Sequence, residues 1–141
     1  MTNKTALVTG ASDGIGLEFC NILAAKGYDL ILVARRKAVL NKLAKALSQQ
    51  YHNINCTVIS TDLSKPQGAQ KLFATTVKKD LHVDLLINNA GLLQNGFFTD
   101  IDLATQENMI SVNILALTSL THLFANAMAT RTGGHILNCL L

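Results

Sequence analysis

The chain has 141 residues, of which 49% are hydrophobic and 15% are charged, and its formal net charge is +3. This length suits one domain, residues 1–141, with its own core, and so apolar a composition excludes an intrinsically disordered chain. The small net charge, with no basic run longer than residues 35–37, argues against nucleic-acid binding.

Short apolar runs alternate with amphipathic segments along the whole chain. The apolar runs predict strands at residues 6–9, 29–34, 55–60, 83–87 and 135–141. Between these runs, apolar residues recur at helical spacing, which predicts helices at residues 14–26, 37–50, 65–79 and 104–130. Such alternation is typical of an α/β fold whose parallel sheet is covered on both faces. The sequence therefore predicts a doubly wound sheet of five strands in the order 3-2-1-4-5, with the first two helices on one face and the last two on the other.

Cysteine and histidine spacing indicates neither a disulfide framework nor a metal site. Cys20, Cys56 and Cys139 are an odd number without a CxxC pair, and the histidines show no ligand spacing. The first apolar stretch is too short for a secretory signal, and residues 109–129 are interrupted by polar side chains. These features predict a soluble, cytoplasmic protein without a membrane span.

The strongest local motif is Thr-Gly-Ala-Ser-Asp-Gly-Ile-Gly at residues 9–16, between the first predicted strand and the first predicted helix. Its first glycine permits a tight turn, the second lets a pyrophosphate approach the main chain, and the third allows close packing of the helix on the sheet. The spacing is GxxxGxG rather than the GxGxxG of the dinucleotide fingerprint, and a purely structural turn is the alternative. The candidate cofactor contacts here are Gly10, Ser12, Asp13, Gly14, Ile15 and Gly16.

The end of the second predicted strand indicates which dinucleotide is bound. A protein that binds NAD places an acidic residue there, about 20 positions after the glycines, to accept a ribose hydroxyl. This chain has Arg35 and Arg36 instead. Guanidinium groups suit a 2′-phosphate, so the pair predicts NADP(H) rather than NAD(H). An exposed basic pair without a ligand is the alternative.

Four motifs together resemble the short-chain dehydrogenase/reductase family and occur in its order over residues 6–139. They are the glycine motif at 9–16, Asp62-Leu63, Asn-Asn-Ala-Gly at 88–91, and Asn113. The resemblance implies a Rossmann-like fold that binds NADP(H). It also implies hydride transfer between the nicotinamide and the carbonyl or alcohol carbon of a substrate that the sequence does not identify.

The resemblance further implies roles for residues after the third and fourth predicted strands. Asp62 would hydrogen-bond the adenine amino group beside the main chain of Leu63, and Asn89, Ala90 and Gly91 would line the cofactor. A turn or helix-capping aspartate is the alternative for Asp62. A simple turn is the alternative for the Asn-Asn-Ala-Gly segment.

Asn113 would be catalytic by this resemblance, as the residue that holds a water in a proton relay beside the cofactor. It interrupts a predicted apolar stripe on the long helix, formed by Ile110, Leu117, Leu120, Phe124 and Ala127. An asparagine that fixes the packing of the core is the alternative, because a buried amide needs partners. Asp13 departs from NADP-binding relatives, several of which have a basic residue there, and its carboxylate would weaken binding of a 2′-phosphate.

The catalytic Ser and Tyr-x-x-x-Lys of the family have no counterpart. Neither Tyr28 nor Tyr51 is followed four residues later by lysine, and Leu141 takes the place of the serine. We therefore expect a truncated form of an NADP-dependent oxidoreductase that lacks turnover. A non-catalytic nucleotide-binding or interaction module, or a remnant without function, is the alternative. The last predicted strand would leave an unpaired edge, which predicts self-association.

Overall fold

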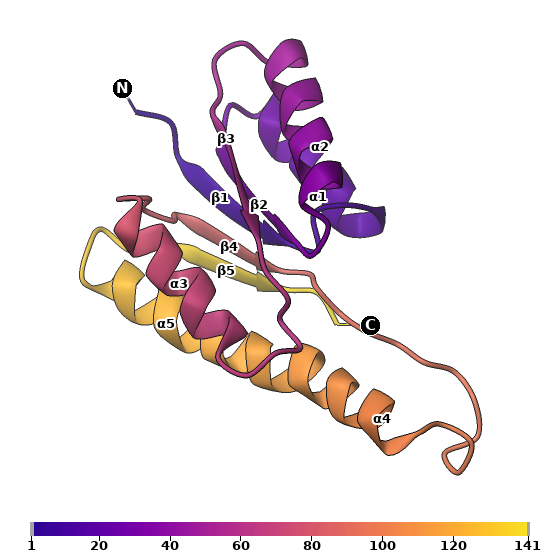
Figure 1. The fold of residues 1–141 in the computed structure, drawn as a ribbon. Coiled ribbons are helices and arrows are strands. Elements are labelled where there is room, and N and C mark those ends of the chain that lie inside the picture. The colour runs from indigo at the N-terminus through magenta and orange to yellow at the C-terminus, as the bar shows by residue number, and fades with distance from the viewer. Residues whose placement is uncertain (1, 141) are drawn as a thin grey trace.

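A computed structural model describes residues 2–140 and contains one five-stranded sheet (Figure 1). Its strands, in chain order, are β1 (Thr5–Thr9), β2 (Asp29–Ala34), β3 (Cys56–Ser60), β4 (Leu85–Asn88) and β5 (His135–Asn138). All four pairings are parallel, and the order across the sheet is β3-β2-β1-β4-β5. This confirms the predicted α/β class and strand order.

The helices connect consecutive strands. They are α1 (Gly14–Ala25), α2 (Lys37–Gln50), α3 (Gly68–Lys78), α4 (Leu103–Ile110) and α5 (Leu117–Ala129), with a π-helical segment η1 (Ser111–Ala116) between the last two. α1 and α2 cover one face of the sheet, and α3 and α5 cover the other, as predicted (Figure 1).

Alternate residues of each strand build the two halves of the core, because successive side chains of a strand point to opposite faces. In β1, Leu7 packs in the cluster that includes the inner faces of α3 and α5. Ala6 and Val8 pack in the other cluster, with α1 and α2. The rings of Phe73 and Phe124 join α3 to α5 in an edge-to-face contact, with centroids 5.1 Å apart.

The long helix differs from the prediction in the residues that it buries. Its buried residues follow one another at steps of four: Val112, Ala116, Leu120, Phe124 and Met128. The predicted stripe began at Ile110, which is 56% exposed. Ile110 is the last residue of α4, which extends past the sheet and has no buried residue (Figure 1).

Three predicted boundaries are also wrong by a few residues. α3 begins at Gly68 rather than at residue 65, because Pro66 disfavours a helical backbone at Lys65. Gln67 then has a φ of 59°, in the left-handed region, just before the helix starts. β4 begins at Leu85 rather than at residue 83. β5 ends at Asn138, and Leu141, at the end of the predicted strand, lies outside the described residues.

The helix Leu103–Ala129, with 27 residues, is long and apolar enough to cross a membrane by length and composition alone. A core helix of a protein without any membrane segment passes the same test. Here α5 packs on α3 and β4, α4 extends past the sheet (Figure 1), and 22% of the most apolar window is buried. The absence of a membrane span therefore stays a prediction.

Candidate functional site

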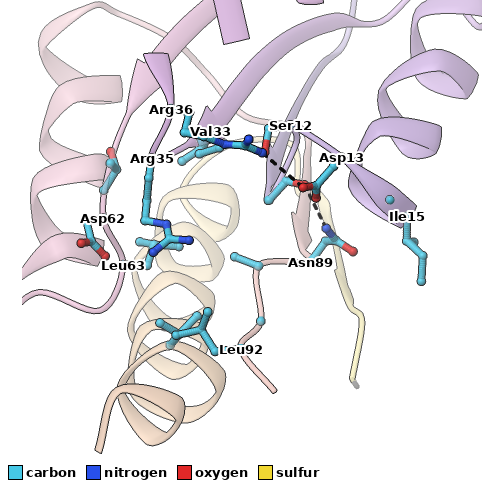
Figure 2. A pocket seen from close by; sticks show the side chains of 17 residues that line it. Ser12, Asp13, Ile15, Val33, Arg35, Arg36, Asp62, Leu63, Asn89 and Leu92 are labelled. Carbon is cyan, nitrogen blue, oxygen red and sulfur yellow. Dashed lines mark hydrogen bonds and ion pairs between the residues drawn. The ribbon is translucent and has the colours of Figure 1, made fainter. Parts of the chain in front are cut away.

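A cavity of about 410 Å³ opens at the carboxyl edge of the sheet (Figure 2). Four chain segments that each follow or end a strand provide most of its lining, within residues 10–15, 33–36, 61–63 and 89–92, and Val112 of η1 completes it. Open α/β sheets bind ligands at this edge, where the strand order reverses direction. That reversal lies between β1 and β4 here, because β1 connects to β2 on one side and pairs with β4 on the other.

Most of the predicted cofactor residues line this cavity. They are Gly10, Ser12, Asp13, Gly14, Ile15, Arg35, Arg36, Asp62, Leu63, Asn89, Ala90 and Gly91. Gly16 and Asn113 do not line it. Five lining residues were not predicted, and each lies within two positions of a predicted residue in the sequence: Val33, Ala34, Thr61, Leu92 and Val112. Their position at a strand end or beside a motif is the signal that could have found them.

The glycine turn has the geometry that its sequence predicts. Gly10 has a φ of 66°, which a residue with a side chain rarely adopts. A Cβ atom at Gly16 would collide with the main-chain oxygen of Gly10 and would crowd the Asn89 amide. Glycine at both positions therefore lets α1 start directly behind β1, close to the loop that follows β4.

Thr9 joins the turn after β1 to the loop after β4. Its buried hydroxyl accepts hydrogen bonds from the main-chain N–H groups of Asn89, at 3.0 Å, and Ala90, at 2.9 Å. The Asn89 side chain donates back to the main-chain oxygens of Thr9, at 3.2 Å, and Gly10, at 3.3 Å. These reciprocal bonds fix the relative position of two walls of the cavity.

The amino end of α1 faces the cavity without a side-chain cap. Asp13 occupies the N-cap position with an extended backbone, but its carboxylate accepts no hydrogen bond from the first turn. That carboxylate instead lies 3.3 Å from the Nη2 atom of Arg36, and both side chains are largely exposed. The free N–H groups and the positive end of the helix dipole favour an anion at this position.

The two arginines of the cavity point in different directions. Arg36 reaches across the opening to Asp13, whereas Arg35 extends toward Leu63 and the side of the cavity that holds Asp62 (Figure 2). The hydroxyl of Ser60 fixes the main chain here, since it donates to the Arg35 carbonyl at 2.8 Å. Within residues 2–140, the Arg35 guanidinium has no hydrogen bond or ion pair.

Asp62 is a turn residue in this structure, as one of its two predicted roles requires. Its carboxylate accepts from both the main-chain N–H and the hydroxyl of Ser64, at 3.0 and 2.6 Å. Chiefly because of the Ser64 hydroxyl, the pKa of Asp62 is lowered from its usual value, and the charges of Lys65 and Arg35 act in the same direction. The carboxylate is therefore ionised, and it still lines the cavity.

Asn113 lies in η1 and is half-buried rather than buried. Its side chain binds the main chain of Leu92, which lines the cavity. A π-helical turn inside an α-helix is frequent at functional sites. The structure thus connects Asn113 to the cavity through Leu92.

Both tyrosines lie away from the cavity. Tyr28 directly precedes β2 and Tyr51 directly follows α2, so both are at the amino edge of the sheet. In the part of the chain that the structure describes, no group of three His, Cys, Asp or Glu side chains could hold a metal ion. The three cysteines are free thiols.

Comparison with known proteins points to one family. A family model described as short chain dehydrogenase matches residues 4–140. An uncharacterised oxidoreductase of Bacillus subtilis, YmfI, is 36% identical over 135 residues, or 95% of this chain and 54% of that protein. The very-long-chain 3-oxoacyl-CoA reductase of Phaeosphaeria nodorum is 37% identical over 135 residues, or 94% of this chain and 40% of that protein.

Solved structures show the same likeness. A short-chain dehydrogenase from Sphingobium yanoikuyae in complex with NADPH has a TM-score of 0.88 and 34% identity, over 96% of this chain and 52% of that one. An alcohol dehydrogenase from Thermococcus sibiricus complexed with 5-hydroxy-NADP has a TM-score of 0.88 and 31% identity, over 97% of this chain and 57% of that one. The chain thus spans about half the length of the proteins that it matches.

Proposed function

Because the chain belongs to the short-chain dehydrogenase family, we propose that the cavity at the carboxyl edge of its sheet binds NADP(H). One observation carries the proposal: the uncapped amino end of α1 and two guanidinium groups line the same cavity. The diphosphate and the 2′-phosphate of the dinucleotide match these two kinds of group. The complexes of the Sphingobium and Thermococcus proteins support the choice of cofactor.

Different lining residues would bind different parts of the dinucleotide, according to their chemistry. The turn at Gly10 and the N–H groups at the start of α1 would hold the diphosphate. Arg35, whose guanidinium has no partner within residues 2–140, would hold the 2′-phosphate. Asp62 and Leu63 would contact the adenine. The loop at residues 89–91, fixed by Thr9, would line the part of the cofactor nearest β4.

When bound, NADP(H) supplies or accepts a hydride, which in this family passes to or from a carbonyl or alcohol carbon. The oxygen on that carbon must gain a proton when a carbonyl is reduced and lose one when an alcohol is oxidised, and the family uses a tyrosine with a lysine four residues later for this transfer. Tyr28 and Tyr51 are at the other edge of the sheet, and neither precedes such a lysine. We therefore propose that these 141 residues bind the cofactor but do not reduce carbonyl compounds by themselves.

A non-catalytic nucleotide-binding module is the second candidate function. The position of both tyrosines favours it, because neither lies where it could give a proton to a substrate in the cavity, and dinucleotide binding needs no such group. The two functions share the binding step and differ in whether a carbonyl substrate is reduced. For both candidate functions, the three free cysteines support the predicted location in the reducing cytoplasm.

We also propose that the 141-residue chain self-associates through β5. In the described residues, β5 pairs with β4 alone, and its other edge carries unpaired main-chain groups. Such an edge is a template for another strand.

Titration with reduced cofactors tests the proposed binding. The chain has no tryptophan, so the nicotinamide's own fluorescence is the signal, checked by calorimetry. We expect saturable binding of NADPH and weaker binding of NADH. Failure to bind either nucleotide, or NADH binding as tight as that of NADPH, would overturn the proposal.

A further inference from the structure

The open edge of β5 presents the main-chain groups of Ile136 and Asn138. The N–H groups of His135 and Cys139 donate to carbonyls in and just before β4, at 2.9 Å each. Successive residues of a strand direct their main-chain groups to alternate sides, so Leu137 also faces β4. Ile136 and Asn138 therefore face away from β4, on the side where no other strand of the described residues lies (Figure 1).

The sequence around β5 does not protect this edge. Charged side chains and prolines at strand edges prevent the addition of another strand. Residues 132–140 contain no lysine, arginine, aspartate, glutamate or proline. Of the large apolar side chains in the described strands, only that of Leu137 is exposed, at 43%. The edge thus combines unpaired main-chain groups with an exposed apolar side chain.

Leu137 lies on the face of the sheet that α1 and α2 cover only in part. Ile136 packs in the cluster with α3 and α5, so the next side chain along the strand points to the opposite face. On that face, α1 packs on β1 and β2, and α2 packs on β2 and β3. A second molecule placed beside β5 can therefore reach the Leu137 side chain.

We propose that two copies of the 141-residue chain join β5 to β5 in antiparallel orientation, with the two-fold axis at Leu137. The inference rests on the proposed self-association through β5 and assigns its partner and register. In this register, Ile136 of each copy is opposite Asn138 of the other, and each such pair exchanges two main-chain hydrogen bonds. The two Leu137 residues form the pair between them, where the Cα atoms are about 4.5 Å apart and the side chains are closest.

The other edge of the sheet, β3, is a poorer partner for β5. α2 packs on β3, where Val58 is half-buried and Ile59 is buried. A contact between β5 of one copy and β3 of the next would also leave an open edge at both ends, so copies would add without limit. Pairing of β5 with itself uses the same surface on both copies and is complete with two.

Hydrogen exchange of the unchanged chain tests the pairing without any substitution. The amides of Ile136 and Asn138 have no partner strand in one copy and gain one in the dimer. We therefore expect them to exchange at least about tenfold more slowly at high than at low protein concentration. The amide of Leu137, which faces β4 in either state, should change much less. Exchange at Ile136 and Asn138 that does not depend on concentration, in a chain that self-associates, would overturn the pairing.

A disulfide across the two-fold axis tests the register. Residues joined by a disulfide have Cα atoms about 4.4–6.8 Å apart, which the two Leu137 positions satisfy. In Leu137→Cys combined with Cys139→Ala, oxidised glutathione should convert most of the chain to a covalent dimer. The second substitution leaves one cysteine after Arg131, so mass spectrometry of tryptic peptides identifies the bond. Leu93→Cys in the same background is the control, exposed but outside any strand, and should link much less.

Sedimentation velocity of the same samples separates this inference from the proposed self-association. Association that stops at the dimer, together with the bond at position 137, supports the antiparallel pair. Species that grow steadily beyond the dimer, or a dimer in which Leu93→Cys links as readily as Leu137→Cys, would overturn the register and leave self-association intact. If the unchanged chain is a monomer at every concentration, the proposed self-association itself fails.

Discussion

The side chain of Asn113 makes both of its hydrogen bonds to the main chain of Leu92, 21 positions earlier. Its Oδ1 atom accepts from the Leu92 N–H at 2.8 Å, and its Nδ2 atom donates to the Leu92 carbonyl at 2.7 Å. The amide therefore pairs with one residue as a neighbouring strand would. It fixes the start of the loop that leads from β4 to α4.

Replacement of Asn113 should loosen this loop. In Asn113→Ala, the N–H and carbonyl of Leu92 lose their partners, and we expect the free energy of unfolding to fall by about 1–3 kcal/mol. Hydrogen exchange at the Leu92 amide should become faster in the same variant. Asn108→Ala, at an exposed position of α4, should change stability by less than about 0.5 kcal/mol. Unchanged exchange at Leu92 would contradict this role.

Reversal of charge at Arg35 should weaken NADPH binding selectively. Arg35→Asp removes a guanidinium that has no partner among the described residues and places a carboxylate in the cavity, so we expect a loss of about 1–3 kcal/mol for NADPH. NADH binding should change much less. Lys42→Asp makes the same change in net charge at an exposed position of α2 and should leave both affinities unchanged. Equal losses of NADPH affinity in Arg35→Asp and Lys42→Asp would contradict a specific role of Arg35 and show a general effect of net charge.

The 141-residue chain should not reduce carbonyl compounds above background, even with NADPH bound. A positioned general acid contributes roughly 10²–10⁴-fold to such a rate, and neither tyrosine is near the cavity. Oxidation of NADPH can be followed with a panel of ketones and aldehydes, with a heat-denatured sample as the control. An ordinary enzymatic rate, on the order of 1 per second, would contradict the prediction.

Stability should fall in alkaline solution because of Cys20. Burial, and to a smaller degree the neighbouring Cys56, raises the pKa of the Cys20 thiol to about 12. Unfolded cysteine titrates near 8.5, so the stabilisation is complete below roughly that pH and is lost as the pH rises toward 12. Cys20→Ala lacks this titration. The difference in unfolding free energy by which the unchanged chain exceeds this variant should therefore shrink between pH 8 and 10. A deficit that stays constant over that range would contradict the assignment.

The open edge of β5 should make the chain self-associate in solution. Sedimentation velocity over a range of concentrations should show species larger than the monomer. Leu137→Lys adds a charge to this strand and should reduce association, because charged residues protect strand edges. Leu93→Lys adds the same charge to an equally apolar but non-strand position, 67% exposed, and serves as the control. A monomer at every concentration would exclude the edge as an association surface.

The strand order and most of the cavity could be predicted because they depend on local patterns. Apolar runs mark the strands, and the residues just after each run necessarily meet at one edge of a parallel sheet. Gly10 and Arg35 were found in this way, although they come from different crossovers. The late start of α3 was also predictable in principle, from the restriction that Pro66 places on Lys65.

The contacts between crossovers could not be predicted from the sequence. The ion pair of Asp13 with Arg36 and the pairing of Asn113 with Leu92 depend on where two loops meet in space. Nor does apolar spacing reveal the π-helical turn, since one extra residue in a turn leaves a pattern that fits a regular helix almost as well. Nor does the spacing show where the long helix leaves the sheet, so Ile110 was expected on its inner face but lies in α4, beyond the sheet, and is exposed.

The π-helical segment η1 holds one residue more than the same stretch of regular helix would. Because the wide turn absorbs this residue, its removal from Ser111–Ala116 would restore a regular helix and leave α4 and α5 in nearly the same relative orientation. The deletion would instead remove the turn from which Asn113 pairs with the main chain of Leu92. A single codon could therefore loosen one wall of the cavity and leave the sheet and the packing of α5 on α3 unchanged.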